Sequence, residues 1–224
     1  MKVLVVGGGG REHAIAWKFN QDKNVSKVYC APGNPGMKDV TPVNITDFNE
    51  LADFAVQEGI ELVMPGPEAP LCAGIVDVFR ERGINIFGPS KDAAVLEGSK
   101  DYAKQFMLKY DIPTAASGTF NNAEDALAYV REQGAPIVVK ADGLAAGKGV
   151  IVAETLEVAE DAVKMCFEGS FGDAGYKVVI EECLFGEEAS LFAFLDGETI
   201  KPLATSQDHK RAYDGDKGPN TGGM

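Results

Sequence analysis

Short β-branched runs alternate with stretches of helical period through the first hundred residues, and few folds accommodate that rhythm. The apolar runs predict strands over residues 2–6, 27–31, 60–64 and 84–87. The stretches between them predict helices over residues 12–20, 48–57, 73–82 and 91–96. Strands that alternate with helices through short connections form a parallel sheet with helices on both faces. The sequence therefore predicts an α/β, Rossmann-like domain over residues 1–98.

The rhythm changes after this domain. A helix is expected over residues 99–110, where Pro113 stops it, and Asn122 is a good N-cap for a second helix over 123–133. A third helix over 158–167 is expected among strands over residues 118–120, 137–141, 150–154, 177–183, 189–195 and 199–205. Hairpin connections outnumber crossovers here, so an α+β domain with antiparallel strands is predicted. Because the sequence ends in the loop-like stretch GPNTGGM, we expect this domain to be truncated.

Composition narrows the possible partners. The 34 acidic residues outnumber the 21 Lys and Arg, which gives a formal net charge of −13, whereas nonspecific nucleic-acid binding needs a basic surface. No apolar run approaches the ~20 residues that cross a bilayer. The four cysteines form no C-x-x-C pair, and two histidines give no zinc pattern. We expect a cytoplasmic protein with reduced thiols and no nucleic-acid or membrane partner, either a monomer or a homodimer.

The stretch KVLVVGGGGREHA predicts a strand, a glycine turn and the start of a helix. A dinucleotide fingerprint, G-x-G-x-x-G, would need glycine where Glu12 or His13 stands, so an NAD-dependent oxidoreductase is disfavoured. Glycines at a helix N-terminus still favour the binding of an anion there. Arg11 lies beside them, and its guanidinium can donate two parallel hydrogen bonds to such an anion. A phosphate or sugar phosphate is expected here, against the alternative of a tight turn without a ligand.

Two further loops are expected at the same edge of the sheet. They are APGNPG, which contains Asn34, and PGPEAPL, which contains Glu68. Ligands bind outside the carboxyl ends of parallel strands, and these two side chains can hydrogen-bond hydroxyls or an amine. Each loop alone could be an ordinary turn without a ligand, but three loops at one edge favour a shared pocket for a small molecule.

The segment GLAAGKG, residues 143–149, is the most informative part of the sequence. It is one residue short of a Walker A loop, has Gly149 in place of the metal-binding hydroxyl, and leads into a strand instead of a helix. We interpret it as a flap between two strands that covers ATP phosphates. Lys140 and Lys148 flank it, and two ammonium groups close together favour an anion between them. The alternative is a hairpin with solvated lysines.

Two acidic segments complete the candidate nucleotide site. The strand end from Glu181 to Leu184 can present backbone groups to an adenine edge, and Glu188 can accept hydrogen bonds from ribose hydroxyls. The charged stretch over 206–224 follows an apolar strand, so it is expected at a strand end near the flap, although such runs are most often solvated.

Seven segments together resemble one family. They are KVLVVGGGGREHA, APGNPG, GPEAPL, LEGSKDYAK, VVKADGLAAGKGV, IEECLFGEEAS and SQDHKRAYDGDKGPNTGGM. These are similar to the phosphoribosylamine–glycine ligase (glycinamide ribonucleotide synthetase) family of the ATP-grasp superfamily, over residues 1–224 without a visible gap. The family chain is about twice as long, so the resemblance implies an amino-terminal half. It implies a pre-ATP-grasp substrate domain over 1–98, an ATP-grasp small subdomain over 99–188 and the start of the large subdomain over 189–224.

The family activity implied is the ATP-dependent ligation of glycine to 5-phosphoribosylamine in de novo purine biosynthesis, through a glycyl phosphate. By the same resemblance, the family's Mg²⁺ or Mn²⁺ ligands lie beyond residue 224, so no metal ligand is expected in this chain and the chain alone is expected to be inactive. The alternatives are another ATP-grasp carboxylate–amine ligase or a carboxylase, and a noncatalytic nucleotide-binding module.

The resemblance also carries residue roles. It assigns ATP to Lys104, Lys140, Gly143, Gly147, Lys148, Gly149, Glu181, Glu182, Cys183, Leu184, Glu188, Arg211 and Asn220. It assigns phosphoribosylamine to Gly9, Gly10, Arg11, Glu12, Asn34 and Glu68. The catalytic candidates near the reacting centre are Asp208, Lys210 and Arg211.

Overall fold

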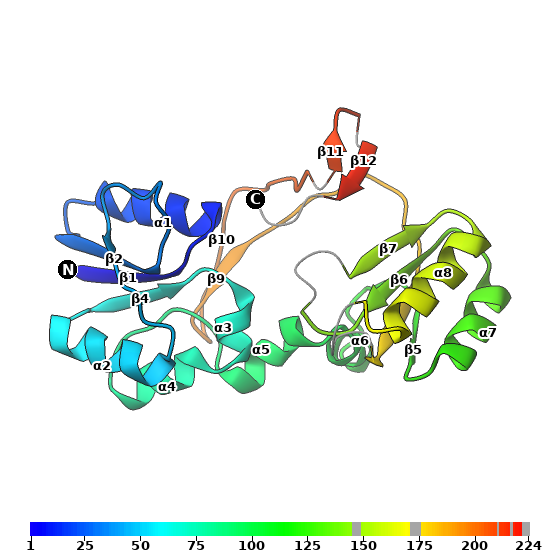
Figure 1. Ribbon diagram of the computed structural model, residues 1–224, viewed down its shortest axis with the longest axis horizontal. Coiled ribbons are helices and arrows are strands. Elements are labelled where there is room, and N and C mark those ends of the chain that lie inside the picture. Colours follow the sequence, from blue (N-terminus) through cyan, green and yellow to red (C-terminus); the bar gives the residue numbers. More distant parts are fainter. Residues whose placement is uncertain (145–148, 171–175, 210, 216, 221–224) are drawn as a thin grey trace. The chain divides into compact units, whose positions relative to one another are not determined.

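The computed structural model describes residues 1–144, 149–170, 176–209, 211–215 and 217–220. The chain divides into two compact units by its own contacts. The first contains residues 1–114 together with 142–144, and the second contains the described residues of 115–141 and 149–220. Each unit is built around its own sheet (Figure 1).

The first unit contains a four-stranded parallel sheet in the order β3-β2-β1-β4. Its strands are β1 (Lys2–Gly7), β2 (Lys27–Pro32), β3 (Thr41–Pro42) and β4 (Leu62–Pro65). Its helices are α1 (Gly10–Asn20), α2 (Phe48–Glu58), α3 (Glu68–Cys72), α4 (Ile75–Glu81), α5 (Lys91–Gly98) and α6 (Lys100–Lys109). The parallel, Rossmann-like sheet predicted from the apolar runs is thereby confirmed.

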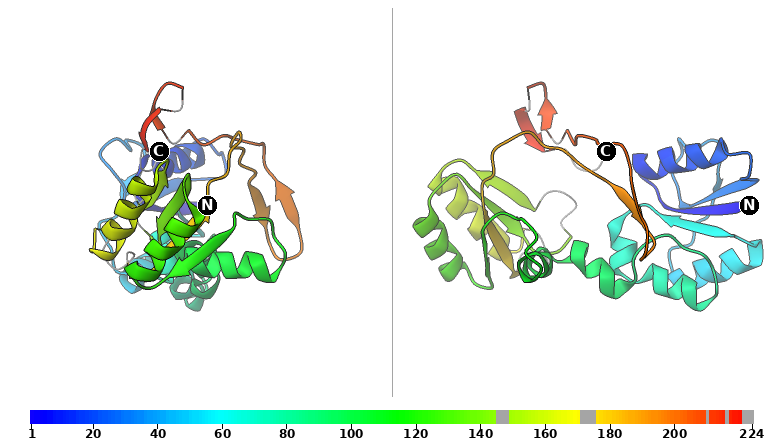
Figure 2. Two further views of the ribbon diagram at one scale, coloured as in Figure 1. Left: turned by 90° about the vertical axis from the view of Figure 1, so that its right-hand side faces the viewer. Right: turned by 180° about the vertical axis from the view of Figure 1, so that it is seen from behind.

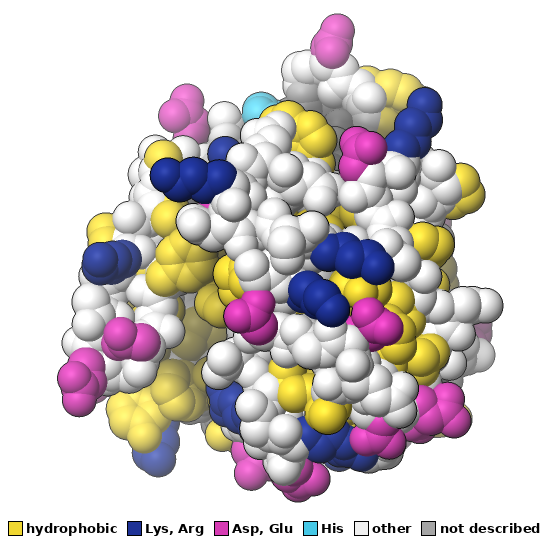
Figure 3. Space-filling model, turned by 90° about the vertical axis from the view of Figure 1, so that its left-hand side faces the viewer, with side chains coloured by type: hydrophobic (Ala, Val, Ile, Leu, Met, Phe, Trp, Pro, Cys, Tyr) yellow, Lys and Arg dark blue, Asp and Glu magenta, His cyan; other side chains and the backbone are white. Residues whose placement is uncertain are grey.

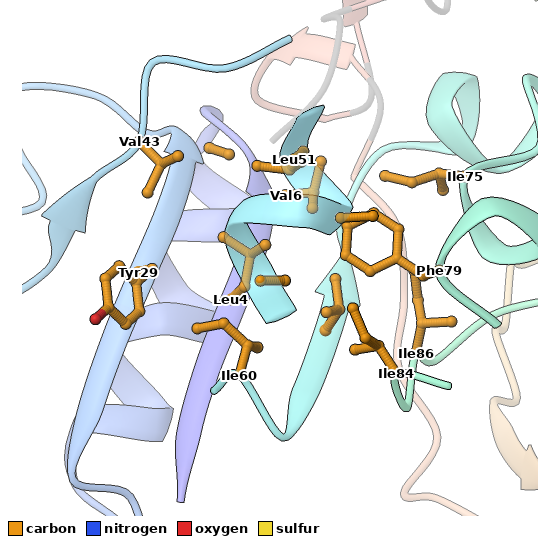
Figure 4. Packing of buried hydrophobic residues seen from close by; sticks show 14 of the residues in the cluster. Leu4, Val6, Tyr29, Val43, Leu51, Ile60, Ile75, Phe79, Ile84 and Ile86 are labelled. Carbon is orange, nitrogen blue, oxygen red and sulfur yellow. The ribbon is translucent and has the colours of Figure 1, made fainter. Parts of the chain in front are cut away.

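Alternate residues of β1 enter two different cores, which is why the strand is apolar along its whole length. Val3 and Val5 face α1 and pack with Ala16. Leu4 and Val6 face the opposite side, where Tyr29, Leu51, Ile75 and Phe79 surround them (Figure 4). Each fully buried side chain of this size contributes about 1.5–3 kcal/mol, so the double covering stabilises the edge that carries the candidate loops.

The structure differs from the sequence prediction at three places in this unit. The helix expected over 73–82 is present as α4, but it is preceded by a separate short helix, α3, in the stretch predicted as a loop, and Gly74 with a left-handed φ of 93° stands between the two. The strand expected over 84–87 is reduced to one parallel bridge, Val63 with Ile86. The two-residue strand β3 gave no sequence signal, since it ends at Pro42 and is too short to show alternation.

The second unit contains a four-stranded antiparallel sheet in the order β5-β8-β6-β7. Its strands are β5 (Ser117–Phe120), β6 (Ile137–Ala141), β7 (Val150–Ala153) and β8 (Val178–Glu182). The helices α7 (Ala123–Gln133) and α8 (Leu156–Phe167) lie side by side against one face (Figure 2). Asn122 caps α7 as predicted, because its side chain accepts the Asp125 N–H at 2.9 Å. The antiparallel α+β arrangement is confirmed.

Two short hairpins follow this sheet. The first pairs β9 (Ala193–Leu195) with β10 (Ile200–Pro202), which are shorter than the strands expected over 189–195 and 199–205. The second pairs β11 (Arg211–Tyr213) with β12 (Lys217–Asn220), where the sequence predicted only a charged loop. Glycine-rich, charged strands lack the apolar alternation from which strands are recognised, so this hairpin gave no signal.

Candidate functional site

Three loops meet at the carboxyl edge of the first sheet, as the parallel arrangement predicts. The loop after β1 is joined to the loop after β2 by the Gly33 N–H, which donates to the Gly7 carbonyl at 3.1 Å. The Asn34 amide donates to the Gly8 carbonyl at 2.8 Å. The loop after β4 is joined to α1 by an ion pair of 3.7 Å between the Arg11 guanidinium and Glu68. The structure therefore brings the predicted residues Arg11, Asn34 and Glu68 to one edge.

Glu12 lies beneath these loops and is only 3% exposed. One carboxylate oxygen accepts the Gly9 N–H at 2.7 Å, and the other accepts the Nε–H of Arg11 at 2.8 Å. A Cβ atom at Gly7 would lie 2.6 Å from the Glu12 Cγ, and one at Gly66 would overlap the Glu12 carboxylate. These glycines thus leave space for a side chain of the protein itself, a role that the sequence reasoning missed.

This carboxylate changes the chemistry of the glycine turn. The N-terminus of α1 attracts anions through its unpaired N–H groups and its dipole, and Glu12 already supplies one negative charge there. The Arg11 guanidinium lies between Glu12 and Glu68 and is half exposed. It can direct its remaining N–H groups to a ligand, since a guanidinium has five donors. The edge therefore offers the Arg11 cation, with the acceptors of Glu68 beside it.

The thiol of Cys30 lies under the same turn, 3.3 Å from the Gly7 carbonyl. Burial, and secondarily the charge of Glu12, raise the pKa of this thiol from 9.0 to about 11. Cys30 is therefore a neutral packing residue near neutral pH, as is Cys166, whose pKa burial also raises to about 11. All four cysteines are free thiols in the structure, as predicted.

The second sheet has one face covered by α7 and α8 and one face free of them. Side chains alternate across each strand, and Val139, Ala141, Val178 and Ile180 belong to the core on the helical face. Lys140 and Glu181 consequently point to the other face. The Lys140 ammonium donates to the Glu181 carboxylate at 2.7 Å. This pair explains why a lysine interrupts an apolar strand. The anion expected between Lys140 and Lys148 stays a prediction, because Lys148 lies outside the described residues.

Lys104, the other lysine predicted to bind phosphates, belongs to the first unit. It lies on α6, is 5% exposed and donates to the Thr114 hydroxyl at 2.7 Å. Buried ammonium groups need a polar partner, and the Thr114 hydroxyl is one for Lys104. No local sequence pattern predicts this contact, because Thr114 lies ten residues away across the turn that ends α6.

The segment that follows β6 is bonded to the N-terminus of α6. Asp142 accepts the backbone N–H of Lys100 at 2.6 Å and of Asp101 at 3.1 Å, and the Ser99 hydroxyl at 3.1 Å. The Lys100 ammonium donates to the Gly143 carbonyl at 2.8 Å. Helix N-termini leave N–H groups without intrahelical partners, and Asp142 satisfies two of them from a remote part of the chain. The beginning of the predicted flap is thereby fixed, while Gly147 and Lys148 lie outside the described residues.

The strand end predicted to hold adenine continues from β8. The Glu182 N–H donates to the Ala116 carbonyl, and the Glu182 carboxylate accepts the Ala116 N–H, both at 2.9 Å. Cys183 is half-buried, whereas Leu184 and Phe185 are exposed, Phe185 to 83%. Glu188 is also exposed. The Glu182 side chain is therefore bonded to Ala116, just before β5, and the exposed apolar side chains begin at Leu184.

The charged stretch supplies the last predicted residues. Asp208 is exposed. Arg211 and Asn220 are paired across the β11–β12 hairpin, so two residues predicted to reach the nucleotide are backbone neighbours. Their side chains, and all of Lys210, lie outside the described part of the chain.

A separate open cavity of about 470 Å³ lies on the outer side of α1, against residues 36–40. His13, Trp17 and Lys38 line it, and none of the predicted site residues does. On the face of the chain shown in Figure 3, acidic and basic side chains are interspersed. The described residues include no cluster of three or more His, Cys, Asp or Glu side chains placed to hold a metal ion. None of the helices in this part of the chain has the length and apolar character needed to cross a bilayer.

Comparison with known proteins covers the whole chain. A family described as phosphoribosylglycinamide synthetase, N domain, matches residues 1–97, and phosphoribosylglycinamide synthetase, ATP-grasp (A) domain, matches residues 98–224. A phosphoribosylamine–glycine ligase from Brucella melitensis is 58% identical over 100% of this chain and 53% of its own length. The chain thus spans about half the length of such relatives.

Solved structures agree. A phosphoribosylamine–glycine ligase from Thermotoga maritima matches with a TM-score of 0.81 and 36% identity, over 99% of this chain and 54% of that one. An N5-carboxyaminoimidazole ribonucleotide synthetase from the same organism matches with a TM-score of 0.65 and 19% identity, over 91% of this chain and 52% of that one. The second likeness is one of fold alone.

Proposed function

The chain belongs to the phosphoribosylglycinamide synthetase family, and we propose that it forms part of a ligase that joins glycine to 5-phosphoribosylamine. The reaction consumes ATP and yields glycinamide ribonucleotide, ADP and phosphate, a step of de novo purine biosynthesis. The observation that carries the proposal is the 58% identity with a ligase of that name over every residue of this chain. The two sets of polar side chains, on the first sheet edge and on the second sheet face, support it.

The proposed chemistry transfers the terminal phosphoryl group of ATP to the glycine carboxylate. The amine of phosphoribosylamine then attacks the acyl carbon, the bond to phosphate breaks, and the amine loses a proton as the amide forms. ATP activates the acid, so no nucleophilic side chain is required. The protein contributes positioning and neutralisation of phosphate charge.

The proposed residue roles divide between the polar side chains at the edge of the first sheet and those on the face of the second sheet. In the first unit, Gly9, Gly10, Arg11, Glu12, Asn34 and Glu68 form the phosphoribosylamine site. Within it the Arg11 cation is directed at the phosphate, and Glu68 and Asn34 at hydroxyls or the amine. Glu12 acts by holding Arg11 and the Gly9 N–H, since both of its oxygens are engaged.

In the proposed nucleotide site, Lys104, Lys140 and the segment Gly143–Gly149 bind the phosphates. The backbone from Glu181 to Leu184 binds adenine, and Glu188 binds the ribose. Arg211 and Asn220 approach from the β11–β12 hairpin, and Asp208, Lys210 and Arg211 act near the reacting carboxylate. The divisions 1–98, 99–188 and 189–224 remain our proposed domain boundaries.

A divalent cation, Mg²⁺ or Mn²⁺, would offset the phosphate charge. The described residues contain no cluster of three or more His, Cys, Asp or Glu side chains that could hold it. Because the chain covers about half the length of its relatives, we propose that the ligands of this cation lie in the part of the longer protein that follows residue 224. We further propose a cytoplasmic location and leave monomer and homodimer as the alternatives for assembly.

The test measures ADP release from two proteins, this chain and a version extended to the length of its relatives. We expect release in the longer protein only when glycine and phosphoribosylamine are both present. The 224-residue chain should bind ATP weakly and release no ADP. Release with bicarbonate in place of glycine would favour a carboxylase, and ATP binding without turnover in the longer protein would favour a binding module. Full substrate-dependent ADP release by the 224-residue chain would contradict the assignment of missing metal ligands.

A further inference from the structure

We propose that the Glu181 carboxylate is a positioning group, which orients the Lys140 ammonium and acts on a nucleotide only through that lysine. The proposal rests on the function proposed above and deepens it. There, Glu181 was part of a stretch whose backbone meets adenine. Here, its side chain has a separate task in the phosphate half of the site.

The strand register places the two side chains together. In the β6–β8 ladder, Val138 is opposite Glu181, and Lys140 is opposite Val179. Lys140 and Glu181 are therefore diagonal neighbours on one face, a separation that long side chains can bridge. The residues between them in each strand, Val139 and Ile180, point into the helical core. The pair is thus fixed by the sheet itself, independently of any loop.

The two partners differ in burial. The Glu181 side chain is 9% exposed and the Lys140 side chain is 25% exposed, with 2.7 Å between Oε2 and Nζ. A carboxylate this buried must be paired, so Glu181 remains tied to the sheet face. The ammonium is the outer member of the pair, and it has three N–H donors, of which one is directed at Glu181. Lys140 is consequently the member placed to contact an anion, and Glu181 supports it from behind.

The chain offers a matched control pair. Arg131 and Glu160 lie at the same 2.7 Å separation, and they join α7 to α8 on the other side of the sheet. Glu160→Gln removes a carboxylate from an ion pair of the same unit without touching Lys140. It therefore reports what the loss of such a pair does to stability alone.

The experiment is a double-mutant cycle on this chain, with Glu181→Gln, Lys140→Met and their combination. Binding of ATP, inorganic tripolyphosphate and adenosine is measured by calorimetry, and the melting temperature of each variant is recorded beside that of Glu160→Gln. We expect Glu181→Gln to weaken ATP and tripolyphosphate about fivefold, the loss of one charge-assisted contact discounted for exposure. Adenosine binding should not change. In the Lys140→Met background the Glu181→Gln change should have no effect on ATP.

Several outcomes would overturn the proposal. One is that Glu181→Gln weakens ATP binding equally in the unaltered chain and in the Lys140→Met variant. Another is that Glu181→Gln weakens adenosine binding as much as ATP binding. The third is that ATP binds to the Glu181→Gln variant as tightly as to the unaltered chain, or more tightly. If the Lys140→Met variant does not fold, the Glu181→Asp variant tests the proposal in its place. The shorter acid keeps the charge but retracts it, and a loss for tripolyphosphate without a loss for adenosine supports positioning, whereas a loss for both refutes it. Absence of nucleotide binding by the unaltered chain would contradict the proposed nucleotide site, and this inference with it, whereas the proposed ligase function is tested separately by ADP release in the longer protein.

Discussion

Gly66 has no side chain because Glu12 occupies the space beside it. The substitution Gly66→Ala would place a Cβ atom on the Glu12 carboxylate, with Cγ and Cδ of Glu12 also in the way. The φ angle of Gly66 is outside the left-handed region, so the backbone itself accepts alanine. The whole effect of the substitution must therefore arise from displacing Glu12.

The expected loss has two parts. Forcing a methyl group into a packed site destabilises a fold by about 1–3 kcal/mol. A displaced Glu12 also loses its bonds to the Gly9 N–H and to Arg11, and a hydrogen bond to a charged group contributes about 1.5–3 kcal/mol. Because displacement relieves part of the clash, we expect a total near 3 kcal/mol. In a unit of this size that corresponds to a fall in melting temperature of roughly 10 °C.

Urea unfolding followed by circular dichroism and by the fluorescence of Trp17 measures this loss. Trp17 is the sequence's single tryptophan and lies on α1, so it reports on the first unit. Gly10→Ala is the matched control, because a Cβ there meets nothing within 4 Å. In a Glu12→Ala background, Gly66→Ala should lower the stability by less than about 0.5 kcal/mol. If the loss is the same in both backgrounds, the clash with Glu12 is not its cause.

Four further predictions concern other features of the chain. Asp142→Ala should lower the free energy of unfolding by about 1–2 kcal/mol, since two N–H groups of α6 lose their acceptor; thermal unfolding measures this, and Asp142→Asn should recover most of it. Cys30 and Cys166 should react with a thiol reagent at about pH 8 only after unfolding, because their folded pKa values are about 11. Raised folded pKa values also mean that the native state keeps protons which the unfolded chain releases, so stability should fall as pH rises from about 9 to 11; melting temperatures across that window check the sign. Lys140→Ala should weaken ATP binding far more than phosphoribosylamine binding, and equal losses would contradict the assignment of two sites.

The sequence was sufficient for the two sheets because both rest on local patterns. Residues 3–6 are apolar at every position, as expected of a strand buried on both faces. In the second sheet, the pairing of β6 with β7 follows from the short spacer between two such runs, and β5–β6 and β7–β8 are connected through α7 and α8. The rule that parallel strands end at one edge also placed Arg11, Asn34 and Glu68 together. These predictions needed no knowledge of side-chain partners.

The sequence could not show which side chains contact one another in the folded protein. Lys140 and Glu181 are 41 residues apart, and their contact depends on the register of two strands that no local pattern fixes. Glu12 was interpreted as a mismatch to a dinucleotide motif and as a substrate contact. Its burial under three loops follows only from the way the sheet edge closes. Gly74 could likewise be a helix residue or a break, and its left-handed conformation decides for the break.

The Asp142 contact with α6 limits how such proteins can be recombined. The family boundary between residues 97 and 98 falls just before Ser99, the N-cap of α6. A crossover there separates α6 from α5, against which it packs, whereas a crossover after residue 114 separates α6 from Asp142. Neither of these two positions preserves both sets of contacts. A chimera of two relatives should therefore inherit residues 99–101 and Asp142 from the same parent.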